Sequence, residues 1–177
     1  MMITEQEIRN ETVIEVAKLM AIAARTAPKG RGTDYMEIAI ASGNDLKIIA
    51  DKMKLIALQT GVTTFNRDAE NVLICEAILI LGTKIHPMRI VKCGMCGFAN
   101  CTEKDKSPDV PCVFNTGDLG IAIGSAVSVA KNHCVDNRIM YTVGQAIKEL
   151  GFFSEDIKII YGIPLSVSSK SPFFDRK

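Results

Sequence analysis

Four of the six cysteines in the chain fall in one short stretch that also contains two glycines. Two thiolates separated by two residues can converge from a single tight turn, and four thiolates form the ligand set of a [4Fe–4S] cluster or of a structural zinc ion. The glycines, Gly94 and Gly97, free the backbone so that N–H groups can point at sulfur and delocalise its negative charge. The spacing is Cys93-x2-Cys96-x4-Cys101-x10-Cys112. We predict that these four cysteines bind one metal centre.

The spacing favours iron and sulfide over zinc. Structural zinc sites often pair two CxxC units or combine two cysteines with two histidines, whereas here the third cysteine follows after four residues and the fourth stands alone. The two histidines, His86 and His133, are too few for a His-rich site or an HExxH motif. We therefore expect one [4Fe–4S] cluster, with zinc as the alternative occupant and an unliganded or disulfide-paired set as a third alternative. The other cysteines, Cys75 and Cys134, lie in apolar segments, and we expect both in the core.

Basic residues gather at two further places in the sequence. Arg25, Lys29 and Arg31 surround the end of the first predicted helix, and Lys170 and Arg176 follow the last predicted strand. An arginine guanidinium matches the oxygens of a phosphate group, so these residues could bind a phosphate. A solvated rim of basic side chains is the simpler interpretation of the same local pattern.

The periodicity of apolar residues predicts the elements that position these groups. The first helix has Thr4 and Glu7 in capping-box spacing at its start. Asn115 or Thr116 would cap the third helix, and Asp136 would cap the fourth. The predicted helices span residues 4–27, 44–61, 118–134 and 136–151, and the predicted strands span residues 37–41, 72–81, 89–92 and 157–165. The apolar run at residues 72–81 is also compatible with the end of a buried helix, and we favour a strand. This order predicts an α+β fold in which helices pack on a mostly antiparallel or mixed sheet.

Length and composition indicate a single folded domain. The chain has 177 residues, of which 47% are hydrophobic and 23% charged, as in ordinary globular proteins. We assign residues 1–177 to one α+β domain in which residues 89–114 form an inserted iron–sulfur loop. The net charge is +1, so the chain has no broad basic field for nucleic acid or an anionic membrane. The acidic N-terminus and the absence of an apolar run of about 20 residues predict a soluble, cytoplasmic protein.

The cysteine motif and three other segments resemble known proteins. The run CGMCGFANC resembles the first three ligands of the four-cysteine iron–sulfur domain found in electron-transfer complex subunits and corrinoid iron–sulfur proteins. Most of the chain resembles a family of small bacterial and archaeal proteins described as containing a ferredoxin-type domain. The segments that carry this resemblance are Ala23–Gly32, Cys93–Cys101, Asn115–Arg138 and Gly162–Arg176. The resemblance implies a ferredoxin-type [4Fe–4S] domain and leaves the reaction open.

The order of predicted elements also resembles the fold of the FMN-dependent nitroreductases. In that family a basic loop after the first helix and a basic residue after the last strand hold the phosphate of FMN at a dimer interface. The resemblance implies that FMN is a second cofactor and that basic residues of this chain would hold its phosphate. Those residues are Arg25, Lys29, Arg31, Lys170 and Arg176.

We expect a homodimer on two further grounds. Gly120, Gly124 and Ser125 give the third predicted helix a surface of small residues that permits close helix packing. Phe173 and Phe174, in an otherwise polar tail, would be poorly buried on a free monomer. A twofold axis that joins two copies would bury both surfaces.

These observations lead to three hypotheses of function. The first is an iron–sulfur redox protein that transfers electrons or serves as the redox partner of an oxidoreductase. The second is a nitroreductase-like FMN oxidoreductase that receives electrons from the cluster. The third is a non-enzymatic protein whose cysteines hold structural zinc. The sequence does not identify the redox partner protein, and we expect neither nucleic acid nor a membrane among the partners.

Overall fold

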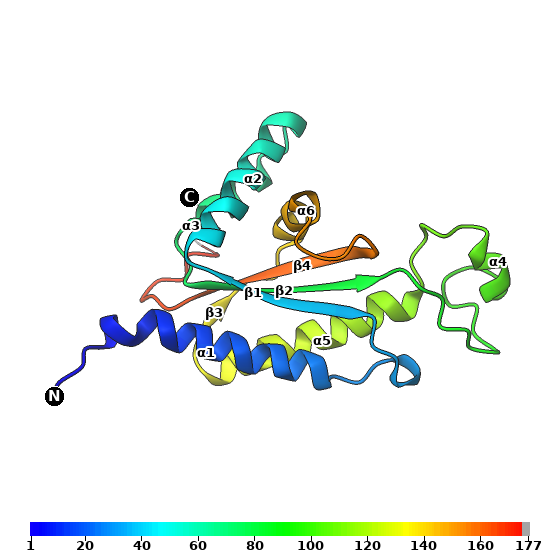
Figure 1. Cartoon of the computed structure of the whole chain (residues 1–177), viewed down its shortest axis with the longest axis horizontal. Coiled ribbons are helices and arrows are strands. Elements are labelled where there is room, and N and C mark those ends of the chain that lie inside the picture. Colours follow the sequence, from blue (N-terminus) through cyan, green and yellow to red (C-terminus); the bar gives the residue numbers. More distant parts are fainter. Residues whose placement is uncertain (175–177) are drawn as a thin grey trace.

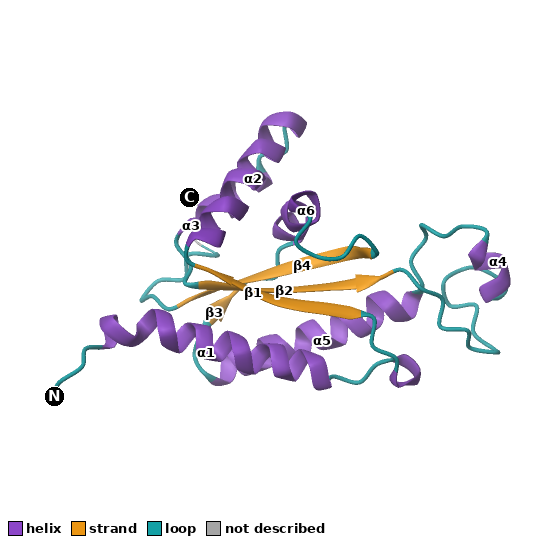
Figure 2. Cartoon of the chain, viewed as in Figure 1, coloured by secondary structure: helices purple, strands orange, loops and turns teal. Residues whose placement is uncertain are grey.

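An antiparallel sheet with four strands in the order β1-β2-β4-β3 lies at the centre of the structure, a computed structural model that describes residues 1–174 (Figure 1). Helices α1 and α5 cover one face of the sheet, and α2, α3 and α6 cover the other (Figure 2). In chain order the elements are α1 (Glu5–Thr26), η1 (Gly30–Gly32), β1 (Met36–Ser42), α2 (Asn44–Thr60), α3 (Thr64–Leu73), β2 (Ala77–Lys84), α4 (Cys101–Asp105), α5 (Val113–Asn132), β3 (Asp136–Asn137), α6 (Tyr141–Leu150) and β4 (Ile157–Ser166). The predicted α+β class is confirmed.

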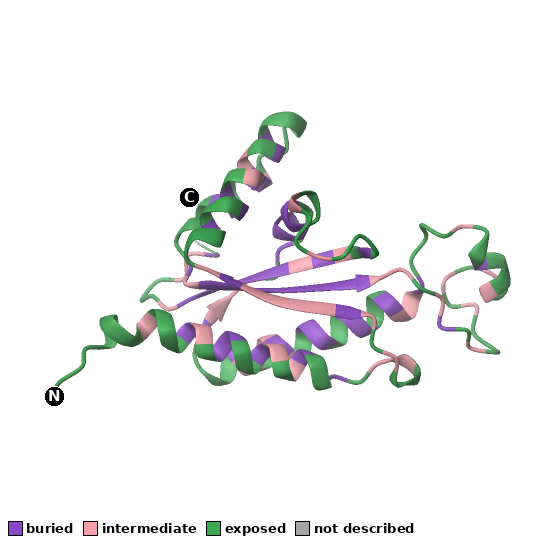
Figure 3. Ribbon diagram, in the orientation of Figure 1, coloured by how far each residue is buried: buried purple, intermediate pink, exposed green. Residues whose placement is uncertain are grey.

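Strand β2 is buried along almost its whole length, because it lies between β1 and β4 and is covered on both faces (Figure 3). Alternate side chains of a strand point to opposite faces of the sheet. Ile78 and Ile80 pack with α2, α3 and α6, whereas Leu79 and Leu81 pack with α1 and α5. Two apolar layers therefore meet at one strand, which explains the nearly continuous apolar run in its sequence.

Two glycines let α6 lie directly on the backbone of β4. A Cβ atom on Gly144 would come within 1.8 Å of the carbonyl oxygen of Ile160. A Cβ atom on Gly162 would come within 2.2 Å of a methyl carbon of Val143. Both positions therefore require a residue without a side chain.

In the first two thirds of the chain, one helix was not predicted and two predicted strands differ from the structure. Helix α3 was not predicted, and β2 begins at Ala77 instead of residue 72. The helical spacing of Phe65, Ala69 and Val72, which α3 buries, is obscured by the apolar run that continues into β2. The strand predicted at residues 89–92 is wrong, because this segment extends beyond the end of the sheet and Arg89 has a φ of 55°.

In the last third, two predicted helix starts differ. The helix predicted from residue 118 begins at Val113, so Asn115 and Thr116 lie inside it and neither caps it. The Oδ1 of Asn115 instead accepts the backbone N–H of His86 (2.9 Å). Asp136 caps no helix: it belongs to β3, whose pairing with the end of β4 satisfies its backbone groups. The following helix, α6, begins at Tyr141.

The tail after β4 is better packed than the sequence predicts. Phe173 is only 2% exposed and belongs to the core formed with α2, α3 and α6. The guanidinium of Arg138 donates a hydrogen bond to the carbonyl oxygen of Phe173 (2.7 Å) and holds the tail in place. The expectation that Phe173 is poorly buried on a monomer is therefore wrong, whereas Phe174 is 61% exposed.

Helix α5 is long and apolar enough to cross a membrane by length and composition, so the expectation that no apolar stretch approaches about 20 residues is wrong. In the fold it packs against α1 and β2 and buries Leu119, Ala122 and Ala126 between them. Core packing accounts for the apolar residues on this side of α5, and 39% of the apolar window is buried in the fold.

Replacing Gly144 by alanine tests the close packing of α6 on β4. The new methyl group would meet the carbonyl oxygen of Ile160, so Gly144→Ala is expected to lower the free energy of unfolding by about 1–3 kcal/mol. Urea denaturation followed by circular dichroism measures this change. Gln145→Ala, at an exposed position of the same helix, is the control and is expected to change stability by less than about 0.5 kcal/mol. Equal stability of the two variants would contradict the packing.

Candidate functional site

The four predicted metal ligands share one part of the molecule. Residues 85–112, which connect β2 to α5, extend beyond the end of the sheet and form what we call the cysteine lobe (Figure 1). The two apolar core clusters found in the described part of the chain include no residue of this lobe. The lobe is attached to the fold at its two ends, by polar contacts, and by two contacts outside those clusters: buried Met88 lies beside Gly30, and the ring of His86 contacts that of Tyr35 (centroids 4.9 Å apart).

Cys93 and Cys96 flank a tight turn. Gly94 and Gly97 have φ values of 75° and 88°, which favour glycine, and the N–H of Gly97 donates to the carbonyl oxygen of Gly94 (3.1 Å). Cys93 is exposed and Cys96 is half-buried. The tight turn that the CxxC spacing predicts is present, and both thiols are accessible.

Cys101 and Cys112 lie where helices start. Cys101 is the first residue of α4, and the side chain of Asn100 before it accepts the N–H of Glu103 (2.9 Å). Cys112 is buried and immediately precedes Val113, the first residue of the long helix α5. The partial positive charge at the N-terminus of a helix stabilises an anion such as a thiolate nearby.

The four sulfurs are not gathered around one point. In residues 1–174, no three Cys, His, Asp or Glu side chains are arranged as ligands of one metal ion. The donor set nevertheless fits a thiolate-bound centre, since the lobe supplies four free cysteines, and three of them are at least partly accessible. Ligation of one centre by all four stays a prediction.

The other two cysteines lie elsewhere, and only one is in the core. Cys75 is buried before β2, and this burial raises the pKa of its thiol to about 12. Cys134 is exposed at the end of α5, where it has a φ of 57°, so its predicted place in the core is wrong.

Arg25 is tied to the start of β1 instead of facing an open site. Its guanidinium donates to Asp34 (2.7 Å) and to the carbonyl oxygen of Met36 (3.2 Å). Partial burial raises the pKa of Asp34, but the hydrogen bonds from Arg25 and from the N–H of Met36 outweigh that effect and leave the pKa below its usual range.

Lys29 and Arg31 are likewise bound within the chain. The Lys29 side chain is only 6% exposed, and its ammonium donates to three carbonyl oxygens at the C-terminal end of α1, at distances of 2.7–3.2 Å. Arg31 donates to the carbonyl oxygens of Met88 (2.9 Å) and Arg89 (3.4 Å). The segment that contains Lys29 and Arg31, which we call the basic loop, therefore caps α1 and contacts the cysteine lobe.

The basic loop and Lys170 lie at opposite ends of β2. Arg31 contacts the chain just beyond the C-terminal end of this strand, whereas the tail that contains Lys170 leaves β4 beside its N-terminal end (Figure 1). Eight residues of strand span roughly 25 Å. One chain therefore does not bring Lys170 to the basic loop, and Arg176 lies outside the described residues.

Two buried polar side chains of α5, which the sequence analysis did not recognise as site residues, hold the basic loop and the lobe together. The carboxylate of Asp118 accepts the N–H of Gly30 with both oxygens (3.1 and 3.0 Å), and Asn115 accepts the N–H of His86. Residues three apart share one face of a helix, and this spacing was the available signal. The Nδ2 of Asn115 is buried and has no hydrogen-bond partner among residues 1–174.

A hollow of about 370 Å³ lies between the basic loop, the CxxC turn and the start of α5. It is lined by Pro28, Lys29, Gly30, Met95, Val113, Phe114, Gly117, Asp118 and Ile121. The lining combines the basic loop, the CxxC turn and the start of α5, so any molecule bound there would lie beside the cysteine lobe.

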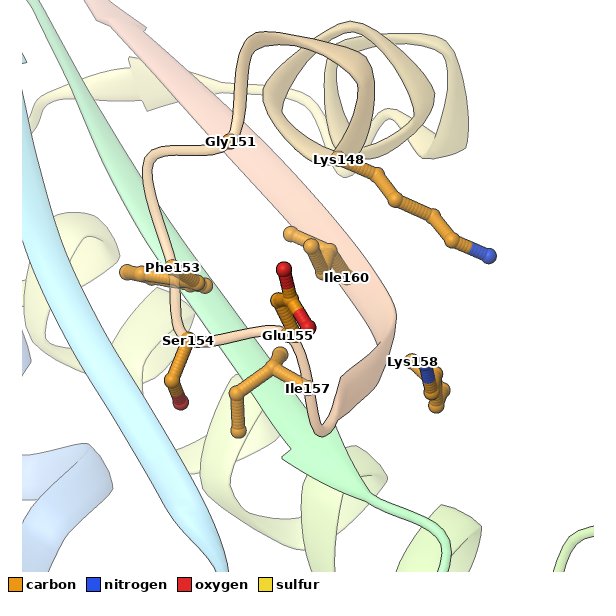
Figure 4. A pocket seen from close by; sticks show the side chains of 8 residues that line it. All are labelled: Lys148, Gly151, Phe153, Ser154, Glu155, Ile157, Lys158 and Ile160. Atoms are coloured by element: carbon orange, nitrogen blue, oxygen red, sulfur yellow. The ribbon is translucent and has the colours of Figure 1, made fainter.

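A second hollow, of about 270 Å³, lies between α6 and the start of β4 (Figure 4). It is lined by Lys148, Gly151, Phe153, Ser154, Glu155, Ile157, Lys158 and Ile160. The backbone N–H of Ser154 donates to Glu37 (3.2 Å), and the Ser154 hydroxyl lies within hydrogen-bond distance of Glu37 and Asp156, which attaches this loop to β1. None of the predicted site residues lines this hollow.

Comparison with solved structures gives the fold. A nitroreductase family protein from Clostridium novyi NT matches with a TM-score of 0.62 and 16% identity, covering 91% of this chain and 76% of that protein. An FMN- and NADPH-dependent nitroreductase derived from Sphigopyxis sp. strain HMH matches with a TM-score of 0.60 and 11% identity, covering 90% and 81%. At these identities the likeness shows a nitroreductase-like fold.

Comparison of sequences gives the family. A protein from Archaeoglobus fulgidus, described as uncharacterized, is 42% identical over 99% of this chain and 98% of its own length. The family model described as "Uncharacterized protein containing a ferredoxin domain (DUF2148)" matches residues 108–176, which include Cys112 but not the CxxC turn. Together these findings place the chain in the family of proteins that contain a ferredoxin domain, built on a nitroreductase-like fold.

Proposed function

We propose that this protein is an iron–sulfur redox protein that binds one [4Fe–4S] cluster and transfers electrons to or from a partner in the cytoplasm. The observation that carries the proposal is the cysteine lobe, in which four free cysteines extend beyond the sheet. The ferredoxin domain in the family description and the redox enzymes that share the fold support the same chemistry. The ligands would be Cys93, Cys96, Cys101 and Cys112.

The local structure of the lobe suits this role. The glycines beside Cys93 and Cys96 allow the turn to adjust, and the start of α5 stabilises negative charge at Cys112. A bound cluster would supply one-electron transfer, and its place in a projecting lobe would keep it within reach of a partner protein. Zinc bound to the same four cysteines would make the lobe structural, and metal analysis separates the two occupants.

We propose that residues 89–114 are an insertion on a fold that stands without them. The support comes from the two core clusters, which draw on α1, α2, α3, α5, α6 and the sheet and on no residue of this segment. Loss of metal should therefore leave most of the secondary structure in place.

A second candidate function is a flavoenzyme in which the cluster supplies electrons to FMN. The observation that favours it is the contact between the basic loop and the cysteine lobe, where Arg31 binds two carbonyl groups and Met95 lines the same hollow as Lys29. Lys170 would come from a second subunit, since β2 separates it from the basic loop within one chain. We propose that Arg176, six residues later in the sequence, would come from the same subunit as Lys170.

We propose that this second subunit is another copy of the same chain. On the outer side of α5, a Cβ atom on Gly117, Gly120 or Gly124 would meet nothing within 4 Å, and Ile121 beside them is 48% exposed. A surface of small and apolar residues allows two such helices to pack closely across a twofold axis.

The cluster is tested with protein purified without oxygen. Wild-type protein is expected to be brown, with broad absorption near ~400 nm that bleaches on reduction, and to contain iron and sulfide. Cys112→Ser is expected to lose most of its iron and to keep its far-ultraviolet circular dichroism, whereas Cys134→Ser, a cysteine outside the lobe, should keep both. A colourless protein that contains zinc would contradict the cluster, and iron retained in Cys112→Ser would contradict the ligand assignment.

FMN binding is tested by quenching of FMN fluorescence with reconstituted, folded protein. If the basic loop holds the phosphate, Arg31→Gln should bind FMN about tenfold more weakly than wild type, because a charge-assisted hydrogen bond is lost. Arg9→Gln, which removes an arginine on α1 that pairs with Glu5, is the control and should bind FMN as wild type does. A folded wild-type protein that binds no FMN rules out the flavoenzyme.

The homodimer is tested by light scattering coupled to gel filtration. Wild type is expected near twice the chain mass of 19.3 kDa. Gly120→Arg places a long charged side chain on the proposed interface and should give monomers. The substitution should leave α5 intact, because arginine favours a helix. Gln59→Arg, on an exposed position of α2, should stay dimeric. Wild-type protein at the mass of one chain would contradict the proposal.

A further inference from the structure

Lys104 is a buried charged side chain in an otherwise exposed part of the molecule. It lies in α4, the short helix of the cysteine lobe, and is only 2% exposed. Lysine is almost never fully buried unless it is paired with a negative group, because removing an ammonium from water is costly. The position of Lys104 therefore calls for a source of negative charge within the lobe.

The neighbouring protein groups do not supply that charge. The ammonium of Lys104 donates to the carbonyl oxygens of Ser107 and Pro108, both at 3.3 Å, which is long for a hydrogen bond to a cation. Within residues 1–174, no carboxylate lies within 4.0 Å of the Lys104 ammonium.

The acidic residues of α4 are already paired with other cations. Glu103 binds the exposed Lys106 (3.0 Å), and Asp105 binds Arg89 (2.5 Å). Lys104 thus differs from Lys106 and Arg89: it is buried and pairs with no carboxylate among residues 1–174, whereas the other two are exposed and paired.

Asp109, the other acidic residue that follows α4, is exposed, and its carboxylate lies more than 4.0 Å from the Lys104 ammonium. The four cysteines are therefore the source of negative charge that we consider next. A metal centre bound by four thiolates is an anion, and an iron–sulfur centre gains one further negative charge when it accepts an electron. Lys104 follows Cys101 by three residues in α4, so the two share one side of this helix. A buried cation interacts with such a centre more strongly than an exposed one, because water and salt screen it less.

We propose that Lys104 is the fixed counter-charge of the four-cysteine centre and that it raises the reduction potential of that centre. The inference rests on the proposed function. Lys104 acts as a positioning and electrostatic group, and it stabilises the reduced form more than the oxidised form because the reduced form carries the additional electron. In the test, dithionite supplies that electron and is itself oxidised to sulfite.

The experiment compares the midpoint potentials of three variants with that of wild type. Each protein is purified without oxygen and titrated with dithionite in the presence of redox mediators, and the absorbance near ~400 nm is followed. At the wild-type midpoint, Lys104→Met is expected to lower the ratio of reduced to oxidised protein about tenfold, which corresponds to about 59 mV for one electron. Lys104→Arg, which keeps the charge, should stay within about twofold of wild type. Lys106→Met is the matched control and should also stay within about twofold, because Lys106 is exposed.

The outcomes separate this inference from the proposed function. Wild-type protein without iron would overturn both. A wild-type cluster whose potential is unchanged in Lys104→Met would overturn the role of Lys104 and leave the iron–sulfur function intact. If Lys104→Met loses its cluster and Lys104→Arg retains it, the charge is required and the inference is supported. If both variants lose it, the shape of the lysine side chain matters instead of its charge, and the inference is wrong.

Discussion

The burial of β2 on both faces is the constraint on which the rest of the structure depends. A strand that is hydrogen-bonded on each side and covered above and below needs two apolar layers, and α1 with α5 and α2 with α3 and α6 provide them. Strand β2 already has a neighbouring strand on each side, so the chain that follows its C-terminal end leaves the sheet at one end of the molecule. The chain emerges there at Lys84 with no further strand to join, and the cysteine lobe is what it builds before it returns at α5.

The lobe is organised by polar contacts instead of an apolar core. Asp118 and Asn115 fix the basic loop and the entrance of the lobe to α5, and Arg31 holds the carbonyl groups of Met88 and Arg89. Such hydrogen bonds specify position while adding little net stability, since each replaces a bond to water. This arrangement suits a site whose final geometry depends on a bound group: the Nδ2 of Asn115 and the ammonium of Lys104 are buried with their bonding capacity incompletely used.

Much of the fold could be predicted from local patterns, because α1, α2, β1 and β4 each have clear periodicity and recognisable ends. Thr4 and Glu7 form the expected capping contact, with the Thr4 N–H donating to Glu7 (2.7 Å), and Gly61 ends α2 with a left-handed φ. Where apolar residues run on without a break, as between Val72 and Leu81, periodicity could not separate the end of a helix from the start of a strand. Asp136 illustrates a different difficulty, since its place in β3 depends on pairing with a strand about thirty residues later.

The candidate site was predictable only where spacing carries the chemistry. The CxxC spacing indicates both a ligand pair and a tight turn, and that turn is present. The contacts of Asp118 with Gly30 and of Arg31 with Met88 join residues far apart in the sequence. The three-residue spacing of Asn115 and Asp118 indicates a shared helix face, but it does not identify the partners of these side chains. Burial of Lys104 is equally hidden, because its sequence neighbours are charged and resemble a solvated helix face.

The attachment of the cysteine lobe at its two ends also bears on how its length can vary. The entropic cost of closing a loop rises only logarithmically with the number of residues, by about 0.6 kcal/mol for each doubling. Residues added between Cys101 and Cys112 would lengthen a segment that contributes nothing to either core cluster. Cys112 would keep its place, because α5 holds it at the edge of the fold. The free energy of folding therefore depends only weakly on the length of the lobe. A lobe of different length could present the same four cysteines to a partner of different shape.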